Sequence, residues 1–332
     1  MSSVDDIYGQ MLGGRFGASP VASKSEKGKG KGKAKKSKGS AGIRESAKKL
    51  TGATIALWTW VKSNFLPTPA NFFYIFNMRD LSRVFQGILR VPRQVISSEK
   101  MLLQLWHHEA ERVFSDKLTG INDKKKFMKE LNAITNKNFG NGTADNIKVK
   151  DEYPLFVDFL REDEYDEDGI LINEAPRVYE HGGRLSDVRP IAQMFLANHN
   201  EDKPSERMEL VLFDDALRHI LRVSRIIGMD RGNALLVGVG GSGKRSSTKL
   251  AAYIARQHIF QISLTKSYNV ASLLEDTREL FKIAGQQGRG VTWIFTDGDI
   301  VTEDFLEYIN SILMTGEVAG LFPKDELNLM VA

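Results

Sequence analysis

The feature that most constrains the fold is a glycine-rich segment in the second half of the chain. Gly238-Val-Gly-Gly-Ser-Gly-Lys244 fits the pattern G-x-x-x-x-G-K and lies between an apolar run, 234–239, and a helix-forming stretch. Glycines in such a loop let backbone N–H groups surround phosphates, the helix N-terminus adds its positive end, and the lysine reaches the β- and γ-phosphates. The segment therefore predicts a nucleotide site. Its expected binding residues are Gly238, Gly240, Gly241, Ser242, Gly243, Lys244, Arg245 and Ser246.

The segments around this loop indicate an α/β fold. Apolar runs typical of buried strands alternate with helix-like stretches, which is the pattern of a three-layered fold with a parallel sheet. We expect strands at 234–239, 259–264 and 291–296, with helices at 244–257 and 272–284.

The same glycines also fit a rival pattern, the G-x-G-x-x-G fingerprint of dinucleotide-binding folds. That reading needs an Asp or Glu near the end of the second strand, where it would bind the ribose. The strand ends instead in Leu264-Thr265-Lys266, without an acid. A lysine directly after the third glycine is typical of a P-loop, so an oxidoreductase is disfavoured.

The residue after the loop lysine departs from the pattern of an active site. A Ser or Thr normally stands there, and its hydroxyl ligates Mg²⁺, whereas this chain has Arg245. Ser246 does not replace it, because one step along a helix rotates the side chain by about 100°. Arg245 is expected either to touch a phosphate or to disfavour the metal through its charge.

A second departure follows the strand at 291–296. Asp297 stands where a carboxylate holds Mg²⁺, directly or through water. ATPases of this class normally carry a glutamate next, which polarises the attacking water, and here the residue is Gly298. Asp299 is expected to point elsewhere. The sequence thus favours binding over turnover.

The first half of the chain is predicted to be helical. Apolar residues recur at helical spacing from Ala47 to Phe65, and Asn77 is a suitable N-cap for the next helix. A third helix contains His107 and His108, which are adjacent, point to different faces and so form no metal-binding pair.

Composition and charge exclude several classes. The chain has no cysteine, so disulfides and cysteine-ligated zinc are excluded, and no apolar run approaches the roughly 18 residues of a membrane span. The net charge of +4 arises from residues 24–38, which carry eight lysines and one glutamate and leave −3 for the rest. Residues 19–42 around it are expected to be disordered, either as a solvated loop or as a contact for an acidic partner such as a microtubule surface, and the absence of aromatic residues among the lysines argues against nucleic acid. Residues 151–168 contain nine acidic residues and are expected to form a solvated linker.

Several stretches resemble dynein heavy chains of the axonemal type. The run at 232–244, GNALLVGVGGSGK, looks like the P-loop of their fourth AAA module, and 297–326 is similar to that module's continuation. LPTPA at 66–70 and FNMRDLSRVFQG at 76–87 resemble the end of the third module, and VLFDD at 211–215 resembles the helix that opens the fourth. The likeness runs in family order from about residue 50 to residue 326.

The resemblance implies a domain organisation. It gives the end of a preceding AAA core at 1–18, an insert without a family counterpart at 19–42, a helical AAA lid-like domain at 43–135, a linker with the acidic segment at 136–200, and a truncated P-loop AAA large domain at 201–332. The expected fold class is therefore α/β, with a helical lid-like half followed by a three-layer core that is incomplete at its C-terminus.

The family pattern also assigns particular positions. Its sensor-2 arginine corresponds best to Arg79, and its axonemal members often have glutamine where this chain has Arg245. Its sensor-1 strand lies between the P-loop strand and the strand at 291–296, and here it would lie beyond Ala332. Both of those strands are then expected to lack a neighbour.

By this resemblance the chain is a nucleotide-binding structural or regulatory part of a dynein motor ring that serves microtubule-based movement. The implied ligands are ATP or ADP, with Mg²⁺ at Asp297, and the implied location is the cytoskeleton and the axoneme of a cilium or flagellum. The implied partners are other AAA modules, dynein intermediate and light chains, and microtubules only through a stalk absent here. Neither a membrane nor nucleic acid is expected as a partner. Two alternatives stay open: an active ATPase motor unit and a non-motor truncated remnant.

Overall fold

The computed structural model describes residues 2–17, 38–166, 171–323, 325–326 and 328. The chain divides into two compact units, Met1–Val188 and Arg189–Ala332, which are described separately below. Most of the segment expected to be disordered, 19–42, lies outside the described residues, and its last residues belong to a helix that begins at Lys38.

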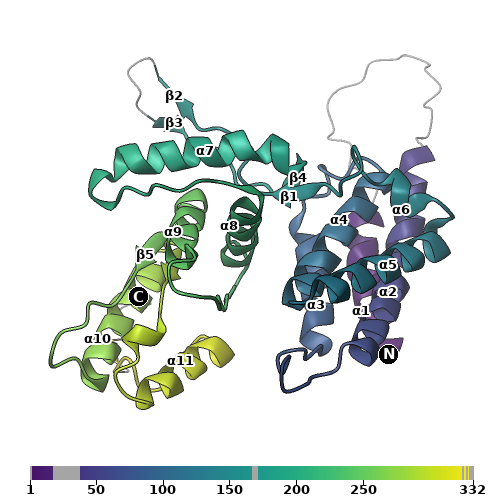
Figure 1. The fold of residues 1–332 in the computed structure, drawn as a ribbon. Coiled ribbons are helices and arrows are strands. Elements are labelled where there is room, and N and C mark those ends of the chain that lie inside the picture. Colours follow the sequence, from purple (N-terminus) through teal and green to yellow (C-terminus); the bar gives the residue numbers. More distant parts are fainter. Residues whose placement is uncertain (1, 18–37, 167–170, 324, 327, 329–332) are drawn as a thin grey trace. The chain divides into compact units, whose positions relative to one another are not determined.

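Unit 1 consists mainly of helices, coloured purple to blue-green in Figure 1. They are α1 (Ser2–Gly17), α2 (Lys38–Asn64), α3 (Met78–Arg90), α4 (Glu99–Val113), α5 (Ile121–Phe139) and α6 (Thr143–Asn146), with a 3-10 turn at Ser115–Lys117. The predicted N-cap of α3 is confirmed. The Asn77 side chain accepts the Arg79 N–H at 2.9 Å, and the Asp80 carboxylate accepts the Asn77 N–H at 3.0 Å. This reciprocal pair satisfies backbone donors that the first turn of a helix leaves unpaired.

The core of unit 1 forms where the apolar stripes of these helices meet. Tyr8 of α1 stacks on Phe85 of α3 with ring centroids 4.3 Å apart, and its hydroxyl donates to Ser82 Oγ at 2.8 Å. Trp106 of α4 is fully buried and donates from its indole to Thr54 Oγ1 of α2 at 2.9 Å. The polar atoms of these large side chains are thus paired as they are buried, which avoids the cost of an unsatisfied donor.

The acidic segment differs from the solvated linker expected from its sequence. Within this segment and just after it, the described residues form two antiparallel ribbons, β1 (Leu155–Val157) with β4 (Glu180–Gly183), and β2 (Glu164–Tyr165) with β3 (Leu171–Asn173). The whole of β1 is buried, and β1 contacts α4. Acidic side chains such as Glu152, Glu162 and Glu164 are exposed, as expected, but the segment is also tied to its surroundings by ion pairs. Asp158 pairs with Arg90 at 2.5 Å, and Arg161 pairs with Glu180 at 2.9 Å.

Unit 2 carries the α/β part of the chain, coloured green to yellow in Figure 1. Its elements are α7 (Leu185–Asp202), which starts in unit 1, a 3-10 turn at Pro204–Glu206, α8 (Asp214–Ile227), α9 (Lys244–Ile254), β5 (His258–Phe260), α10 (Val270–Phe281), a π-helical turn at Lys282–Gln286, β6 (Val291–Trp293), a 3-10 turn at Asp297–Asp299 and α11 (Asp304–Thr315). The strands β5 and β6 are parallel, and α8 packs on α9. Tyr268, Leu273 and Phe305 form a small core beside them.

The α/β class is confirmed, but one predicted strand is wrong. Residues 234–239 form no strand, and Leu235, Val237 and Val239 are 92%, 86% and 79% exposed. A strand needs a neighbour to take up its backbone hydrogen bonds, and among the described residues this run has none. The expectation that the strand at 291–296 lacks a neighbouring strand is also wrong. β6 pairs with β5, and the Ile294 N–H donates to the Phe260 carbonyl at 3.0 Å.

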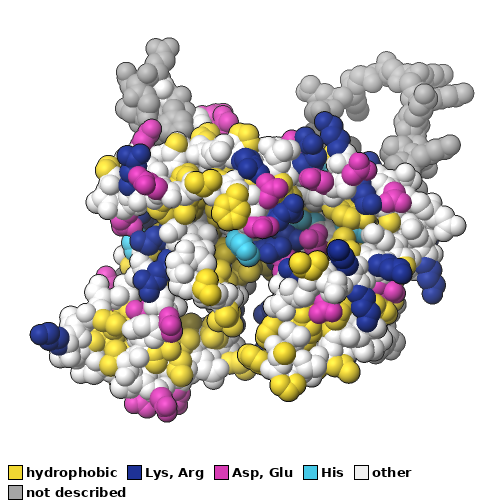
Figure 2. Space-filling model, in the orientation of Figure 1, with side chains coloured by type: hydrophobic (Ala, Val, Ile, Leu, Met, Phe, Trp, Pro, Cys, Tyr) yellow, Lys and Arg dark blue, Asp and Glu magenta, His cyan; other side chains and the backbone are white. Residues whose placement is uncertain are grey.

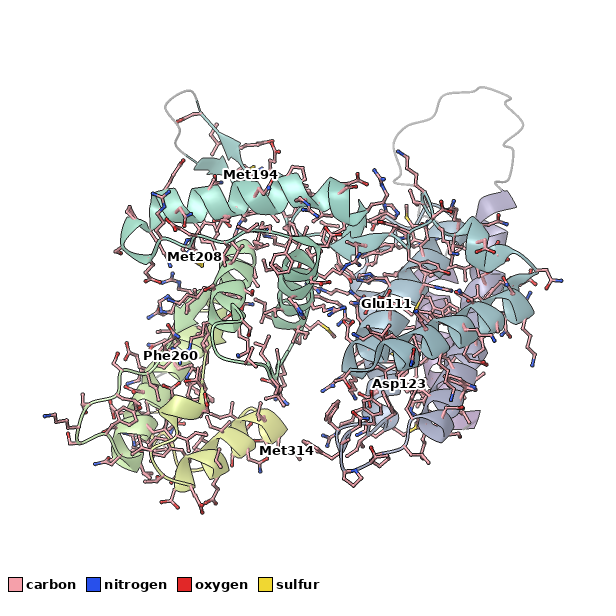
Figure 3. All side chains as sticks on the ribbon, viewed as in Figure 1. Glu111, Asp123, Met194, Met208, Phe260 and Met314 are labelled. Carbon is pink, nitrogen blue, oxygen red and sulfur yellow. The ribbon has the colours of Figure 1, made fainter. Side chains whose placement is uncertain are left out.

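Among the described helices, none combines the length and the apolar character that crossing a bilayer requires. Figure 2 shows hydrophobic side chains gathered on the surface over α10 and α11, where Leu306, Leu313 and Met314 are about half exposed. Figure 3 marks Met314 near the end of α11 and Phe260 on β5.

Candidate nucleotide-binding site

The glycine loop lies between the exposed run at 234–239 and the start of α9. Gly241 and Gly243 have φ angles of +75° and +76°, a left-handed conformation that glycine adopts without steric cost. Gly243 is also the N-cap of α9, so Lys244 is the first residue of the helix. The glycine positions in the sequence are therefore what allows the chain to turn sharply from the loop into the helix.

Lys244 is held by its own loop. Its ammonium donates to the carbonyls of Gly238 and Val239, both at 2.8 Å, and to Ser242 Oγ at 3.2 Å. The loop thus curves around a positive charge. A phosphate oxygen placed in this loop would take over hydrogen bonds that the carbonyls now accept.

The backbone donors of the loop are free. Within the described part of the chain, the N–H groups of Gly240, Gly241, Ser242 and Gly243 donate to no protein acceptor. They precede an 11-residue helix whose N-terminus carries a partial positive charge. Free amides, a helix N-terminus and a lysine in one short segment are the donor set that binds phosphates. The residues present therefore fit a nucleoside phosphate.

Arg245 links this loop to the end of β6. Its Nη2 donates to Thr296 Oγ1 at 3.0 Å, although the two residues are 51 positions apart. The hydroxyl of Ser246, the next residue of α9, makes no hydrogen bond to another described residue. The structure thus places the P-loop helix beside the acidic turn, as the sequence motifs require.

The acidic turn at Asp297–Asp299 is organised by Thr296. The Thr296 N–H and hydroxyl both donate to Asp299 Oδ2, at 2.7 and 2.8 Å. This capping arrangement turns Asp299 back onto the backbone, in agreement with the expectation that it points elsewhere. Asp297 is exposed, and its carboxylate has no partner among the described residues. Gly298 contributes no carboxylate that could polarise water.

These residues do not fit a conventional Mg²⁺ site. At the position after the lysine, where a hydroxyl would ligate the metal, Arg245 places a guanidinium instead. The nearby Thr296 hydroxyl donates its hydrogen bond to Asp299 and accepts one from Arg245. Asp297 is left as the one uncommitted carboxylate of the turn. Within the described residues, His, Asp and Glu side chains form no group of three or more that could hold a metal ion.

Arg79, matched above to the sensor-2 arginine, belongs to unit 1 rather than to the unit that carries the loop. It lies in the first turn of α3, where only its backbone N–H is held by the Asn77 cap. Its side chain is exposed and makes no recorded contact among the described residues. The guanidinium is thus uncommitted within the described part of unit 1.

Sequence reasoning missed Thr296, which the structure places at the centre of the contacts between α9 and the acidic turn. A signal for it exists in the sequence, because Thr296 and Asp299 have the three-residue spacing of a capping pair at the start of a turn. Its bond to Arg245 could not be predicted from local spacing.

Comparisons with known proteins agree with this geometry. Residues 208–332 match the family model described as the P-loop containing dynein motor region D4, and residues 50–150 match the AAA+ lid domain. Dynein axonemal heavy chain 5 of Mus musculus is 44% identical over 291 residues, which is 86% of this chain and 6% of the relative. The flagellar outer-arm dynein gamma chain of Chlamydomonas reinhardtii is 38% identical over 353 residues, which covers 100% of this chain and 7% of the relative.

A third relative, dynein axonemal heavy chain 6 of Homo sapiens, is 39% identical over 295 residues, 87% of this chain and 7% of its own length. The chain thus spans less than a tenth of each of these relatives. Within that span both family matches and the order of the motifs agree. The chain belongs to the axonemal dynein heavy-chain family.

Proposed function

We propose that this chain is a nucleotide-binding structural or regulatory part of a dynein heavy-chain motor ring that serves microtubule-based movement in the axoneme. The observation that carries the proposal is the glycine loop at the start of α9, with four free amides and Lys244 at its centre. ATP or ADP bound there would order the loop. Its partners would be the other AAA modules of the ring, together with dynein intermediate and light chains.

The role is structural or regulatory because the site lacks the means for turnover. Gly298 occupies the position of the water-polarising glutamate, and the donors for Mg²⁺ are not assembled. Loss of a positioned general base alone typically lowers a rate by two to four orders of magnitude. Bound nucleotide would therefore stabilise one arrangement of unit 2 for long periods instead of driving a cycle. A ligand that binds only the folded state also raises the free energy of unfolding.

Binding is tested by titrating the full chain with a fluorescent ADP analogue. We expect saturable binding that Lys244→Ala abolishes, because this change removes the cation around which the loop curves. Lys249→Ala is the matched control. It removes a lysine from the same helix that pairs with Glu206 at 3.1 Å, away from the loop, and it should leave affinity unchanged. Equal affinity of Lys244→Ala and the parent chain would refute the assignment of the loop.

Turnover is tested by phosphate release from ATP. We expect a rate at the background of a protein-free control, because no carboxylate is placed to polarise water next to Asp297. A rate of about one per second that disappears in Lys244→Ala would show an active ATPase and would overturn the structural role. Circular dichroism of each variant confirms that the comparison is made on folded protein.

A further inference from the structure

The contacts of Arg245 bear on whether a nucleotide at this site would bind with Mg²⁺ or without it. P-loop sites normally balance the phosphate charges with a lysine and a Mg²⁺ ion, which the next residue's hydroxyl holds. Here the lysine is present, but the second cation next to it is a side chain of the protein. Arg245 Nη2 donates to Thr296 Oγ1 at 3.0 Å, which holds its guanidinium between the loop helix and the acidic turn.

Most of the hydrogen-bonding capacity of this guanidinium is unused. Arginine has five N–H donors, and Thr296 is the one partner recorded for Arg245 among the described residues. Its side chain is exposed. The remaining donors have the planar fork that matches two phosphate oxygens at once, which is the geometry in which arginine binds phosphates most strongly.

The groups that would have to hold a metal are engaged elsewhere. The Thr296 hydroxyl donates to Asp299 Oδ2 at 2.8 Å, and the same oxygen accepts the Thr296 N–H at 2.7 Å. Asp297 alone keeps a free carboxylate. A divalent cation at this carboxylate would also be repelled by the nearby positive charge of Arg245.

We propose that this site binds nucleotide free of Mg²⁺ and that Arg245 supplies the charge that the metal supplies elsewhere. The inference rests on the proposed function, since it concerns the same loop. Mg²⁺ associates more tightly with a triphosphate than with a diphosphate, so more ADP than ATP is metal-free when Mg²⁺ is abundant. The site therefore selects ADP under those conditions.

The test measures the affinity of fluorescent ADP and ATP analogues for the full chain, once with excess EDTA and once with excess Mg²⁺. The parent chain should bind ADP in EDTA at least as tightly as in Mg²⁺, and Mg²⁺ should weaken ATP binding more than ADP binding. Arg245→Thr restores the usual hydroxyl and removes the charge. It should lose tenfold or more of its affinity in EDTA and recover at least part of it with Mg²⁺.

Two further measurements distinguish the loss of the Arg245 charge from a loss of folded protein. With ADP present, bound Mn²⁺ detected by electron paramagnetic resonance should be absent from the parent and present in Arg245→Thr. Thr296→Val keeps the arginine but removes the partner that orients it, so affinity in EDTA should fall severalfold; it also removes the hydroxyl bond to Asp299, so the unfolding transition shows how much stability that bond contributes. Arg245 is exposed, so its substitution leaves the core intact.

The outcomes distinguish this inference from the function on which it rests. Parent binding that requires Mg²⁺, or bound Mn²⁺ in the parent, overturns the role of Arg245 while nucleotide binding stands. No binding under either condition, or undiminished binding by Lys244→Ala, overturns the nucleotide site and this inference with it.

Discussion

The two units bury their apolar residues to very different extents. In unit 1, Trp106, Phe85 and Phe114 are fully buried, and the stripes of successive helices face one another. In unit 2 the residues just before the glycine loop are apolar yet open to solvent, with Leu235 at 92% exposure. The overall composition of both units is that of core-forming protein, so the difference lies in how each kind of element satisfies its backbone.

A helix makes its backbone hydrogen bonds within itself, whereas a strand makes them with a neighbour. The helices of unit 1 therefore need only contact between side chains to form a core. Residues 234–239 need a paired strand before their side chains can be covered, and among the described residues neither β5 nor β6 pairs with them. The glycine loop is thus joined at one end to helix α9 and at the other to a segment that pairs with no strand among the described residues.

The largest expected effect is in the core of unit 1. Trp106→Ala should lower the free energy of unfolding by about 3–5 kcal/mol, because it leaves a cavity among α2, α4 and α5 and removes the indole bond to Thr54. Chemical denaturation followed by circular dichroism measures the change. Leu235→Ala is the matched substitution in unit 2 and should change it by less than about 0.5 kcal/mol. Similar losses for both variants would show that 234–239 is buried after all.

A smaller effect concerns the pH dependence of unit 1. His107 is fully buried, with Nε2 2.6 Å from Thr135 Oγ1 and its ring stacked on Tyr153. Burial, with a smaller contribution from the positive charge of Lys148, lowers the pKa of His107 to about 3. The unfolded chain takes up a proton near the ordinary pKa of 6.5, whereas the folded chain does not. The stabilisation from the neutral ring is therefore complete above pH 6.5 and is lost as the pH falls towards 3.

Between pH 7 and pH 5 this linkage should cost about 2 kcal/mol of unfolding free energy. Urea titrations at several pH values, read by tryptophan fluorescence, measure it well, since Trp58, Trp60 and Trp106 all lie in unit 1. His107→Gln should reduce the dependence to the part that remains from His181, whose pKa burial also lowers, while substitution of an exposed histidine of α8, His219→Gln, should leave it as in the parent. An equally steep pH dependence in His107→Gln would assign the effect to other groups.

The same contrast explains how much of the structure the sequence could predict. Asn77 was identified correctly because capping depends on residues three positions apart, and α2 followed from the spacing of Leu50, Leu57 and Val61. The glycine loop and the start of α9 were also predictable, because φ angles near +75° at Gly241 and Gly243 are a local requirement.

What depended on distant pairing was predicted poorly. The run at 234–239 has the composition of a buried strand, but its state depends on which strands lie beside it. The acidic segment was expected to be a solvated linker because of its charge, but β1 within it is buried and pairs with β4, and Asp158 pairs with Arg90, 68 positions away. The contact of Arg245 with Thr296 joins residues 51 positions apart, which no local pattern reveals.

The smallest expected effect on stability is at the exposed run itself. Leu235→Ser combined with Val237→Ser should change the free energy of unfolding by less than about 0.5 kcal/mol, because both side chains already face water. Solubility should increase, whereas a destabilising substitution in the core would decrease it. An apolar segment rich in β-formers, without a pairing partner, promotes association between molecules, and two serines interrupt it. Light scattering at increasing protein concentration measures this gain.

Amide hydrogen exchange gives the complementary test. The Leu236 amide should exchange nearly unprotected, the Ile294 amide should exchange more slowly because it donates to Phe260, and the amides of Leu81 and Phe85 should exchange most slowly. Protection of Leu236 equal to that of Leu81 would mean that the run pairs in solution, and the contrast between the two units would then disappear beside the glycine loop.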